Sequence, residues 1–210
     1  MKEEKVFIPS QGIQLEGLLS IPEAFSIKGG MILCHPHPQY GGDMHNPVVS
    51  TAAGVAFQEG FSTLRFNFRG VGRSGGSYSD GVGESEDVQT AIEYLFLKLN
   101  RSTLPFILVG YSFGAWAGLS AVIQDNRVKG MVAIAPPLEL YDFKLLEGSK
   151  KKKLLVAGDQ DFFCPVALLK SWFEQLEEPK SLAIIEGADH FFFAHTRFLI
   201  EPLREFFKSV

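Results

Sequence analysis

At 210 residues the chain is long enough for one well-filled hydrophobic core and short for two, so we expect one domain over residues 1–210. A formal net charge of −4 gives no attraction to nucleic acid or to an anionic membrane. The first residues are charged, no apolar signal or spanning segment follows them, and Cys34 and Cys164 suit reduced thiols. We therefore expect a cytoplasmic protein without a nucleic-acid or membrane partner. The oligomeric state is left open.

Short apolar runs recur along the chain and predict strands. Residues 5–9 and 14–21 predict an opening pair, with Ser10-Gln11-Gly12 as the turn between them. The later runs are continuously apolar, which predicts strands buried on both faces. These runs are residues 30–34, 62–68, 106–111, 130–135, 153–158 and 181–185.

Helical patterns lie between the later runs. Residues 84–99 combine apolar residues at helical spacing with an acidic first turn, and a second helix begins near Pro47. Pro165 begins a third helix, and residues 194–208 predict a closing helix that Pro202 should kink or divide. Alternating strands and helices predict an α/β fold, a mostly parallel, doubly wound sheet with helices on both faces. In such sheets the chemistry lies in loops at the carboxyl ends of strands.

The motif Gly110-Tyr111-Ser112-Phe113-Gly114 follows one of these apolar runs and precedes a helix rich in small residues. In that context G-x-S-x-G predicts a nucleophile elbow, a turn so tight that the positions flanking the serine must be glycine. The turn presents the Ser112 hydroxyl at a helix N-terminus, where N–H groups favour developing negative charge. The alternative is a glycine-flanked serine in an ordinary turn.

A serine nucleophile needs a histidine base and an orienting carboxylate, and the elbow proteins carry them in the order Ser, Asp or Glu, His. The sequence offers Asp161 and His190 in this order, each just after a predicted strand. Asp159 competes with Asp161 for the role of the acid. His195 competes with His190, but it falls inside the predicted closing helix, where a partly exposed surface position is expected.

These features resemble the α/β-hydrolase family. The segment Gly158-Asp159-Gln160-Asp161 resembles the family's G-x-x-D turn, whose last residue is the acid. The resemblance therefore implies the triad Ser112, Asp161 and His190, and leaves Asp159 as a side chain that caps the loop. Arg69-Gly70-Val71-Gly72-Arg73-Ser74 likewise resembles a family loop that follows the fourth strand.

The segment from Cys34 to Asn46 resembles the family's oxyanion loop, but it has Pro36 where glycine is usual. Because Pro36 and Pro38 have no N–H, the donor between them is the backbone of His37. The resemblance implies that His37 and Phe113 provide the two N–H groups of the oxyanion hole.

Two rival interpretations attach to these loops. His35, His37, Asp43 and His45 could form a zinc or di-metal hydrolase cluster, although the prolines constrain the first two. The ordinary role of His45 and Asn46 would be to cap the helix near Pro47.

The other rival is a dinucleotide site, because residues 70–75 match G-x-G-x-x-G. A dinucleotide fingerprint needs its helix to begin within the motif, whereas here a loop follows the glycines. We therefore predict neither a cofactor nor a metal.

The resemblance covers nearly the whole chain and is closest to small bacterial serine hydrolases with a His-Pro-His-Pro loop, near the dienelactone-hydrolase-like and carboxylesterase-like branches. It implies hydrolysis of a small-molecule ester through an acyl-enzyme. Thioesterase and acyl-peptidase activities stay open, as do a metal-dependent hydrolase and a binding scaffold without catalysis. Residues 138–152 are too few for a cap domain.

Two surface features remain. The run Lys150–Lys153 predicts a solvated turn before a strand. Phe162, Phe163 and residues 191–193 flank the proposed acid and base, and they predict either core packing around the site or binding of an acyl group.

Overall fold

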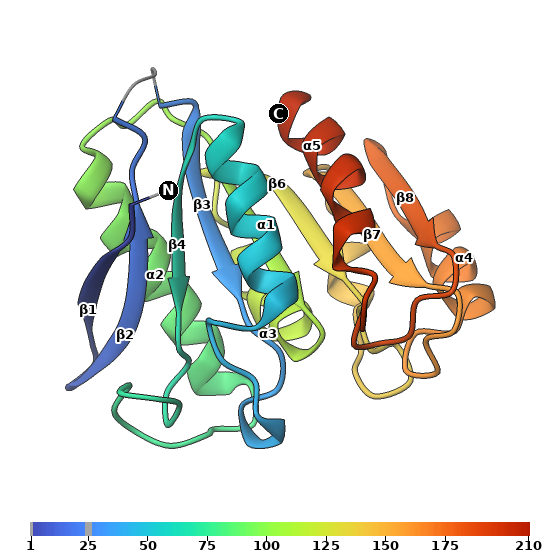
Figure 1. The fold of residues 1–210 in the computed structure, drawn as a ribbon, viewed down its shortest axis with the longest axis horizontal. Coiled ribbons are helices and arrows are strands. Elements are labelled where there is room, and N and C mark those ends of the chain that lie inside the picture. Colours follow the sequence, from blue (N-terminus) through green and yellow to red (C-terminus); the bar gives the residue numbers. More distant parts are fainter. Residues whose placement is uncertain (1, 24–26) are drawn as a thin grey trace.

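The computed structural model describes residues 2–23 and 27–210. In this part of the chain eight strands form one sheet, in the order β1-β2-β4-β3-β5-β6-β7-β8 (Figure 1). The strands are β1 (Glu4–Ser10), β2 (Ile13–Ser20), β3 (Gly29–Cys34), β4 (Phe61–Phe66), β5 (Phe106–Tyr111), β6 (Val128–Ile134), β7 (Lys152–Gly158) and β8 (Lys180–Ile185). The predicted strands are confirmed, with ends shifted by a few residues.

The opening strands form an antiparallel hairpin, in which Val6 pairs with Gly17, and β2 in turn pairs antiparallel with β4. Every other neighbouring pair in the sheet is parallel. The continuous apolar runs explain the difference, because parallel strands are covered on both faces and need apolar side chains on both.

Helices cover both faces, as Figure 1 shows. On one face lie α1 (Pro47–Gln58) and α5 (Ile200–Lys208), which contact each other. On the other lie α2 (Val82–Leu99), α3 (Phe113–Val122) and α4 (Val166–Gln175). Three short 3-10 helices complete the described elements: η1 (Pro38–Tyr40), η2 (Lys144–Leu146) and η3 (Thr196–Leu199).

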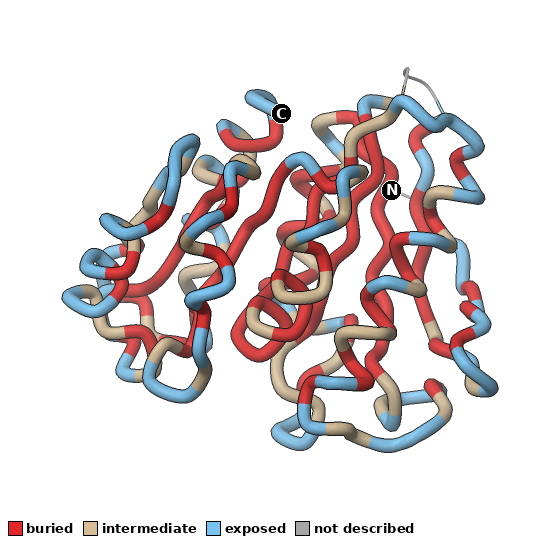
Figure 2. The backbone as a smooth tube through the Cα atoms, turned by 180° about the vertical axis from the view of Figure 1, so that it is seen from behind, coloured by how far each residue is buried: buried red, intermediate tan, exposed pale blue. Residues whose placement is uncertain are grey.

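Two hydrophobic cores lie on opposite faces of the sheet. In β3, Met31 and Leu33 pack in the core under α1 and α5, whereas Ile32 and Cys34 pack in the core under α2 and α3. This alternation follows from the two-residue period of a strand. Figure 2 shows the result, with the central strands buried and the exposed segments at the periphery.

The strand order reverses its direction at β3. The chain passes from β3 to β4 on one side of it, and later to β5 on its other side. The loops leaving β3 and β5 therefore diverge, and such a switch point opens a site at the carboxyl ends of the strands. His35 directly follows β3 and Ser112 directly follows β5.

The closing region differs from its prediction. It is divided between Leu199 and Ile200, where η3 ends and α5 begins, and Pro202 lies in the first turn of α5. Proline is tolerated there because the first N–H groups of a helix have no intrahelical acceptor.

No cap covers the sheet, because η2 is the helical element described between β6 and β7. Across residues 2–23 and 27–210, none of the helices has the length and apolar character needed to cross a bilayer.

Candidate active site

Ser112 occupies a strained turn between β5 and α3. Its backbone has φ +54° and ψ −122°, a conformation that costs free energy for any residue with a β-carbon. Strain of this kind persists where the surrounding structure enforces it. The strand before Ser112 and the helix after it are both buried, so they hold the turn in place.

The two flanking glycines are required by steric contacts. A β-carbon on Gly110 would lie 2.5 Å from the Cα of Ala115, and one on Gly114 would lie 2.5 Å from the backbone oxygens of Cys34 and His35. Neither position can hold a side chain without moving backbone. The G-x-S-x-G pattern is therefore the sequence signature of this close packing.

A continuous hydrogen-bond chain joins the three residues predicted as a triad. Ser112 Oγ lies 2.9 Å from His190 Nε2, and His190 Nδ1 lies 2.8 Å from Asp161 Oδ2. A carboxylate accepts hydrogen bonds, so Nδ1 carries the proton and Nε2 is free to accept the one on Ser112 Oγ. All three residues are buried, and Ser112 is the most exposed of them at 8%.

The two candidate acids have different surroundings. Asp161 Oδ1 accepts the N–H groups of Phe163, at 2.9 Å, and Cys164, at 3.0 Å, which leaves Oδ2 directed at His190. Asp159 Oδ1 instead accepts the Gly187 N–H at 2.8 Å and is exposed. The structure thus brings Asp161 to the histidine and places Asp159 as the cap of a neighbouring loop.

The two candidate histidines also separate. The Tyr111 hydroxyl donates to the carbonyl of His190 at 2.9 Å and ties its loop to the end of β5. His195 is the N-cap residue of η3, and its Nδ1 donates to the Phe193 carbonyl at 2.6 Å. The expectation that His195 lies inside the closing helix is wrong, because the helix begins after it. No pattern in the sequence indicated the hydrogen bond from the Tyr111 hydroxyl to the His190 carbonyl.

His35 fastens the loop after β3 to the end of β4. Its Nε2 accepts the Phe68 N–H at 3.0 Å, and its Nδ1 donates to the Pro36 carbonyl at 2.6 Å. Only a neutral ring can make both bonds. Complete burial disfavours the charged form and lowers the pKa of His35 to about 4.

His37 lies against α3, the helix that follows Ser112. Its ring centroid is 4.9 Å from that of Phe113, and its Nε2 lies 3.2 Å from the Tyr78 hydroxyl. Its Nδ1 accepts the Gln39 N–H at 3.2 Å, so Nε2 is the donor to Tyr78. Burial lowers the pKa of His37, which favours the neutral ring.

The segment from Arg69 to Glu84 carries Tyr78 to this contact. The Arg69 side chain donates to buried Asp87 at 2.9 Å, and Glu84 accepts the N–H groups of Ser79 and Gly81. The helix α2 begins at Val82, beyond the glycine motif of residues 70–75, and a loop occupies the interval, as predicted. The contact of Tyr78 with His37 had no sequence signal, since it depends on the path of this loop.

The proposed metal-ligating residues are engaged separately. Both ring nitrogens of His35 have backbone partners, and Asp43 Oδ1 accepts the His45 N–H at 2.8 Å. Asn46 caps α1 by accepting the Val48 N–H at 2.9 Å, the ordinary role expected for this segment. In the described residues, three or more His, Cys, Asp or Glu side chains do not gather into a group that could hold a metal.

Comparison with known proteins identifies relatives of the whole arrangement. A family model described as "Serine aminopeptidase, S33" matches residues 28–152. An uncharacterised protein of Rickettsia prowazekii (strain Madrid E) is 35% identical over 169 residues, covering 77% of this chain and 71% of that protein.

Two solved structures share the fold closely. The first is an α/β serine hydrolase homologue from Coxiella burnetii, with 34% identity, a TM-score of 0.90, and coverage of 98% of this chain and 97% of that one. The second, from Xanthomonas campestris, is an α/β serine hydrolase without a lid, with 29% identity, a TM-score of 0.89, and coverage of 100% and 95%. The chain therefore belongs to this family of α/β serine hydrolases, and to its capless members.

Proposed function

We propose that the protein hydrolyses small esters through an acyl-enzyme intermediate formed on Ser112. The observation that carries this proposal is the hydrogen-bond chain from Ser112 Oγ through His190 to buried Asp161. A serine hydroxyl is a poor nucleophile alone, and this arrangement offers a neutral imidazole nitrogen to accept its proton.

The first half-reaction forms the acyl-enzyme. As Ser112 Oγ bonds to the ester carbonyl carbon, its proton passes to His190 Nε2, and the carbonyl electron pair moves onto oxygen. When that pair returns, the bond to the alkoxy oxygen breaks, and His190 gives its proton to the departing alcohol. Asp161 stabilises the transient imidazolium.

The second half-reaction restores the enzyme. A water molecule gives a proton to His190 Nε2 and bonds to the acyl carbon, and the Ser112 ester bond then breaks with return of that proton to Oγ. The acid is the second product. The balance requires water and no cofactor.

The oxyanion is assigned to the N–H groups of Phe113 and His37. Phe113 is the first residue of α3, so its N–H has no acceptor within the helix. The aromatic contact between the two side chains supports the placement of the His37 backbone beside that N–H. Preorganised donors of this kind stabilise a developing oxyanion.

An open site favours short acyl groups. Without a cap, an acyl chain beyond a few carbons would lie partly in water and lose much of the ~0.8 kcal/mol gained per buried CH₂. We expect kcat/KM to be highest for acetyl or butyryl esters and to fall for octanoyl and palmitoyl esters. A steady rise of kcat/KM up to the palmitoyl ester would contradict an acyl site that is open to solvent.

A fluorophosphonate probe tests the proposal directly. We expect covalent labelling and short-chain ester hydrolysis in the wild-type protein, and loss of both in Ser112→Ala. Ser171→Ala is the matched control, since Ser171 is an exposed serine on α4, and it should label normally. An unlabelled wild-type protein would favour a binding scaffold, and activity lost to a chelator and restored by zinc would favour metal chemistry.

Thioester and amide bonds are tested with matched substrates. Comparing an ester, a thioester and an amide of the same acyl group measures the preference on one scale of kcat/KM. An amide asks most of proton delivery to the leaving group, so we expect the ester to be preferred to the amide.

A further inference from the structure

Four phenylalanines form a strip of consecutive ring contacts, with the ring of His190 in the middle. Ring centroids are 4.1 Å apart for Phe162 and Phe163, and 4.8 Å apart for Phe163 and His190. The distance is 5.5 Å from His190 to Phe191, and 5.7 Å from Phe191 to Phe193. We call these four residues, without the histidine, the phenylalanine strip.

The strip is exposed and yet held in place. The exposed fractions are 66% for Phe162, 51% for Phe191 and 72% for Phe193. The backbone N–H of Phe163 donates to Asp161, and that of Phe191 donates to Asp189 Oδ1 at 3.1 Å. Core packing around the site, one of the two interpretations of these residues, therefore does not describe their outer members. A fixed apolar surface beside a reacting group is suited to contact with a substrate.

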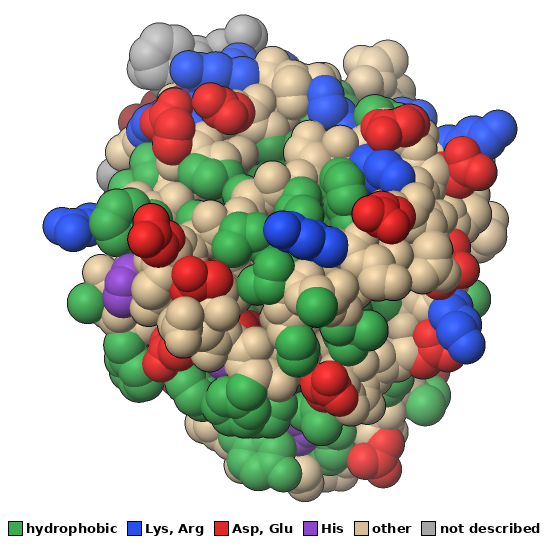
Figure 3. Space-filling view, turned by 90° about the vertical axis from the view of Figure 1, so that its right-hand side faces the viewer, with side chains coloured by type: hydrophobic (Ala, Val, Ile, Leu, Met, Phe, Trp, Pro, Cys, Tyr) green, Lys and Arg blue, Asp and Glu red, His purple; other side chains and the backbone are tan. Residues whose placement is uncertain are grey.

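The two loops that carry the strip are acidic. Residues 159–165 and 186–196 contain four carboxylates and neither lysine nor arginine. The next cation along the chain, Arg197, lies over the ring of Phe198 at 4.7 Å. Hydrophobic and acidic side chains also gather at the lower end of the face in Figure 3, the end at which the parallel strands finish. An anionic group would be repelled here.

The mechanism determines which part of a substrate lies on the strip, an inference that rests on the proposed function. His190 Nε2 returns its proton to the departing oxygen, so the leaving group must lie within hydrogen-bond reach of that nitrogen. In the proposed function the oxyanion is assigned to the backbone N–H groups of Phe113 and His37, not to His190. The rings of Phe163 and Phe191, which contact the His190 ring, therefore border the leaving group.

We propose that the phenylalanine strip binds the alcohol part of the ester, and that the substrates are short-acyl esters of neutral, apolar or aromatic alcohols. Aromatic rings gain from edge and offset contacts with the four phenyl groups. Substrates whose leaving group carries a phosphate or a carboxylate, coenzyme A among these groups, are hydrolysed poorly because the surrounding carboxylates repel them.

Three acetate esters test this proposal: those of ethanol, of benzyl alcohol, and of 4-(hydroxymethyl)benzoate. All three share the acyl group, and the last two share the ring, but the third carries a carboxylate at neutral pH. We expect kcat/KM to be about tenfold higher for the benzyl than for the ethyl ester. The carboxylate should abolish most of that gain, and added salt should restore part of it.

Paired variants locate the effect. In the double variant Phe162→Ala, Phe193→Ala the benzyl-to-ethyl ratio should fall to within about threefold of unity. Leu145→Ala is the matched control, because Leu145 is also 66% exposed but lies at the amino ends of the strands, and its ratio should stay at the wild-type value.

The outcomes separate this proposal from the ester hydrolysis on which it rests. If none of the three esters is hydrolysed, the proposed function fails and takes this inference with it. Equal kcat/KM for all three, or an unchanged ratio in the double variant, leaves ester hydrolysis standing and overturns the role of the strip. A dimer that the double variant dissociates while the ratio is unchanged would show that a second copy covers the strip, and would overturn it as well.

Discussion

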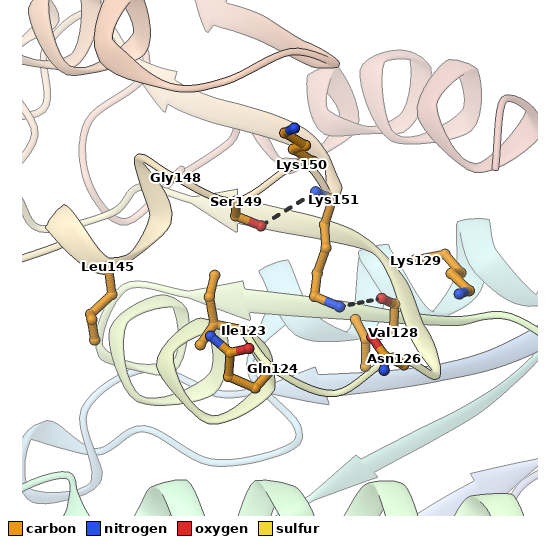
Figure 4. A pocket seen from close by; sticks show the side chains of 10 residues that line it. All are labelled: Ile123, Gln124, Asn126, Val128, Lys129, Leu145, Gly148, Ser149, Lys150 and Lys151. Carbon is orange, nitrogen blue, oxygen red and sulfur yellow. Dashed lines mark hydrogen bonds between the residues drawn. The ribbon is translucent and has the colours of Figure 1, made fainter.

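The two ends of the parallel strands differ in how their polar side chains are satisfied. At the amino ends, a hollow of about 560 Å³ is lined by polar residues, among them Lys129, Lys150 and Lys151 (Figure 4). The ammonium group of Lys151 donates to the carbonyls of Asp125, at 2.6 Å, and Val128, at 2.8 Å. These two hydrogen bonds engage the ammonium group with backbone carbonyls of the neighbouring segment.

At the carboxyl ends the polar groups are arranged in series. Asp161 accepts two backbone N–H groups and bonds His190, which in turn bonds the Ser112 hydroxyl. The hydrogen bonds there converge on one hydroxyl oxygen, that of Ser112. Acid–base chemistry requires groups aligned for proton transfer, and the hydrogen-bond chain at the carboxyl ends has this alignment, whereas the hollow at the amino ends does not.

Removing the base should have the largest effect. His190→Ala leaves Ser112 without a proton acceptor, and we expect turnover of a short-chain ester to fall on the order of 10⁴–10⁶-fold. The control is Lys151→Gln at the amino ends, which should hydrolyse the ester at the wild-type rate. Steady-state kinetics with one ester measures the turnover of both variants. Comparable losses in the two variants would contradict the difference between the two ends of the strands.

The acid should rank second. Asp161→Asn presents an amide to His190 and favours the wrong tautomer, so we expect a loss of about 10⁴-fold in kcat. Asp159→Asn changes a loop cap two residues away, and we expect less than about threefold. The same kinetic assay compares them. A damaging Asp159→Asn beside a mild Asp161→Asn would reassign the acid.

Local patterns made the strands predictable from sequence, and they pointed to the three residues that the structure joins by hydrogen bonds. Buried parallel strands need continuous apolar runs, and the steric demand of the elbow appears directly as Gly110 and Gly114. The Asp159 and Asp161 alternatives needed a family resemblance, because both follow the same strand. In the structure, the N–H groups of Phe163 and Cys164 distinguish Asp161 from Asp159.

Features set by long-range packing were not predictable. The contact of Tyr78 with His37 depends on the path of a loop that Arg69 and Asp87 hold, and burial of the hydroxyl raises the pKa of Tyr78 to about 12. The division of the closing region at Leu199 left no periodic signal, because apolar residues continue across it.

The two hydrogen bonds of the buried, neutral His35 ring should make the stability of the protein depend on pH. Its folded-state pKa of about 4 lies below the ordinary 6.5, so below pH 6.5 the unfolded chain takes up a proton that the folded protein does not. The stabilisation is complete above pH 6.5 and is lost as the pH falls toward 4, by about 3 kcal/mol at pH 4.

Chemical denaturation from pH 7 to pH 4.5 measures this loss. We expect His35→Gln to be less stable at pH 7 but to lose less between the two pH values, since glutamine does not titrate. His45→Gln, at an exposed histidine, should keep the wild-type slope. Identical slopes in all three proteins would mean that His35 is not held neutral.

A smaller effect distinguishes two lysines at the amino ends. The run Lys150–Lys153 was predicted to be solvated, and this is wrong for Lys153, which is 2% exposed. Because β7 already begins at Lys152, the next side chain points inward, where it shares the lining of a small cavity with Leu119, Leu155 and Trp172. Its ammonium group donates to the carbonyls of Ser149 and Lys151, at 2.6 and 2.8 Å.

We expect Lys153→Ala to lower the free energy of unfolding by about 2 kcal/mol and Lys150→Ala, at an exposed lysine, to change it by less than about 0.5 kcal/mol. The value lies at the low end for a large side chain because burial lowers the pKa of Lys153, so its removal also recovers a desolvation cost. Lys153→Met keeps the apolar stem and removes the two hydrogen bonds, and it should lie between the alanine variant and the wild type. Urea denaturation at neutral pH ranks the three. Equal effects of the two alanine substitutions would mean that Lys153 is solvated like Lys150 and does not lie in the core.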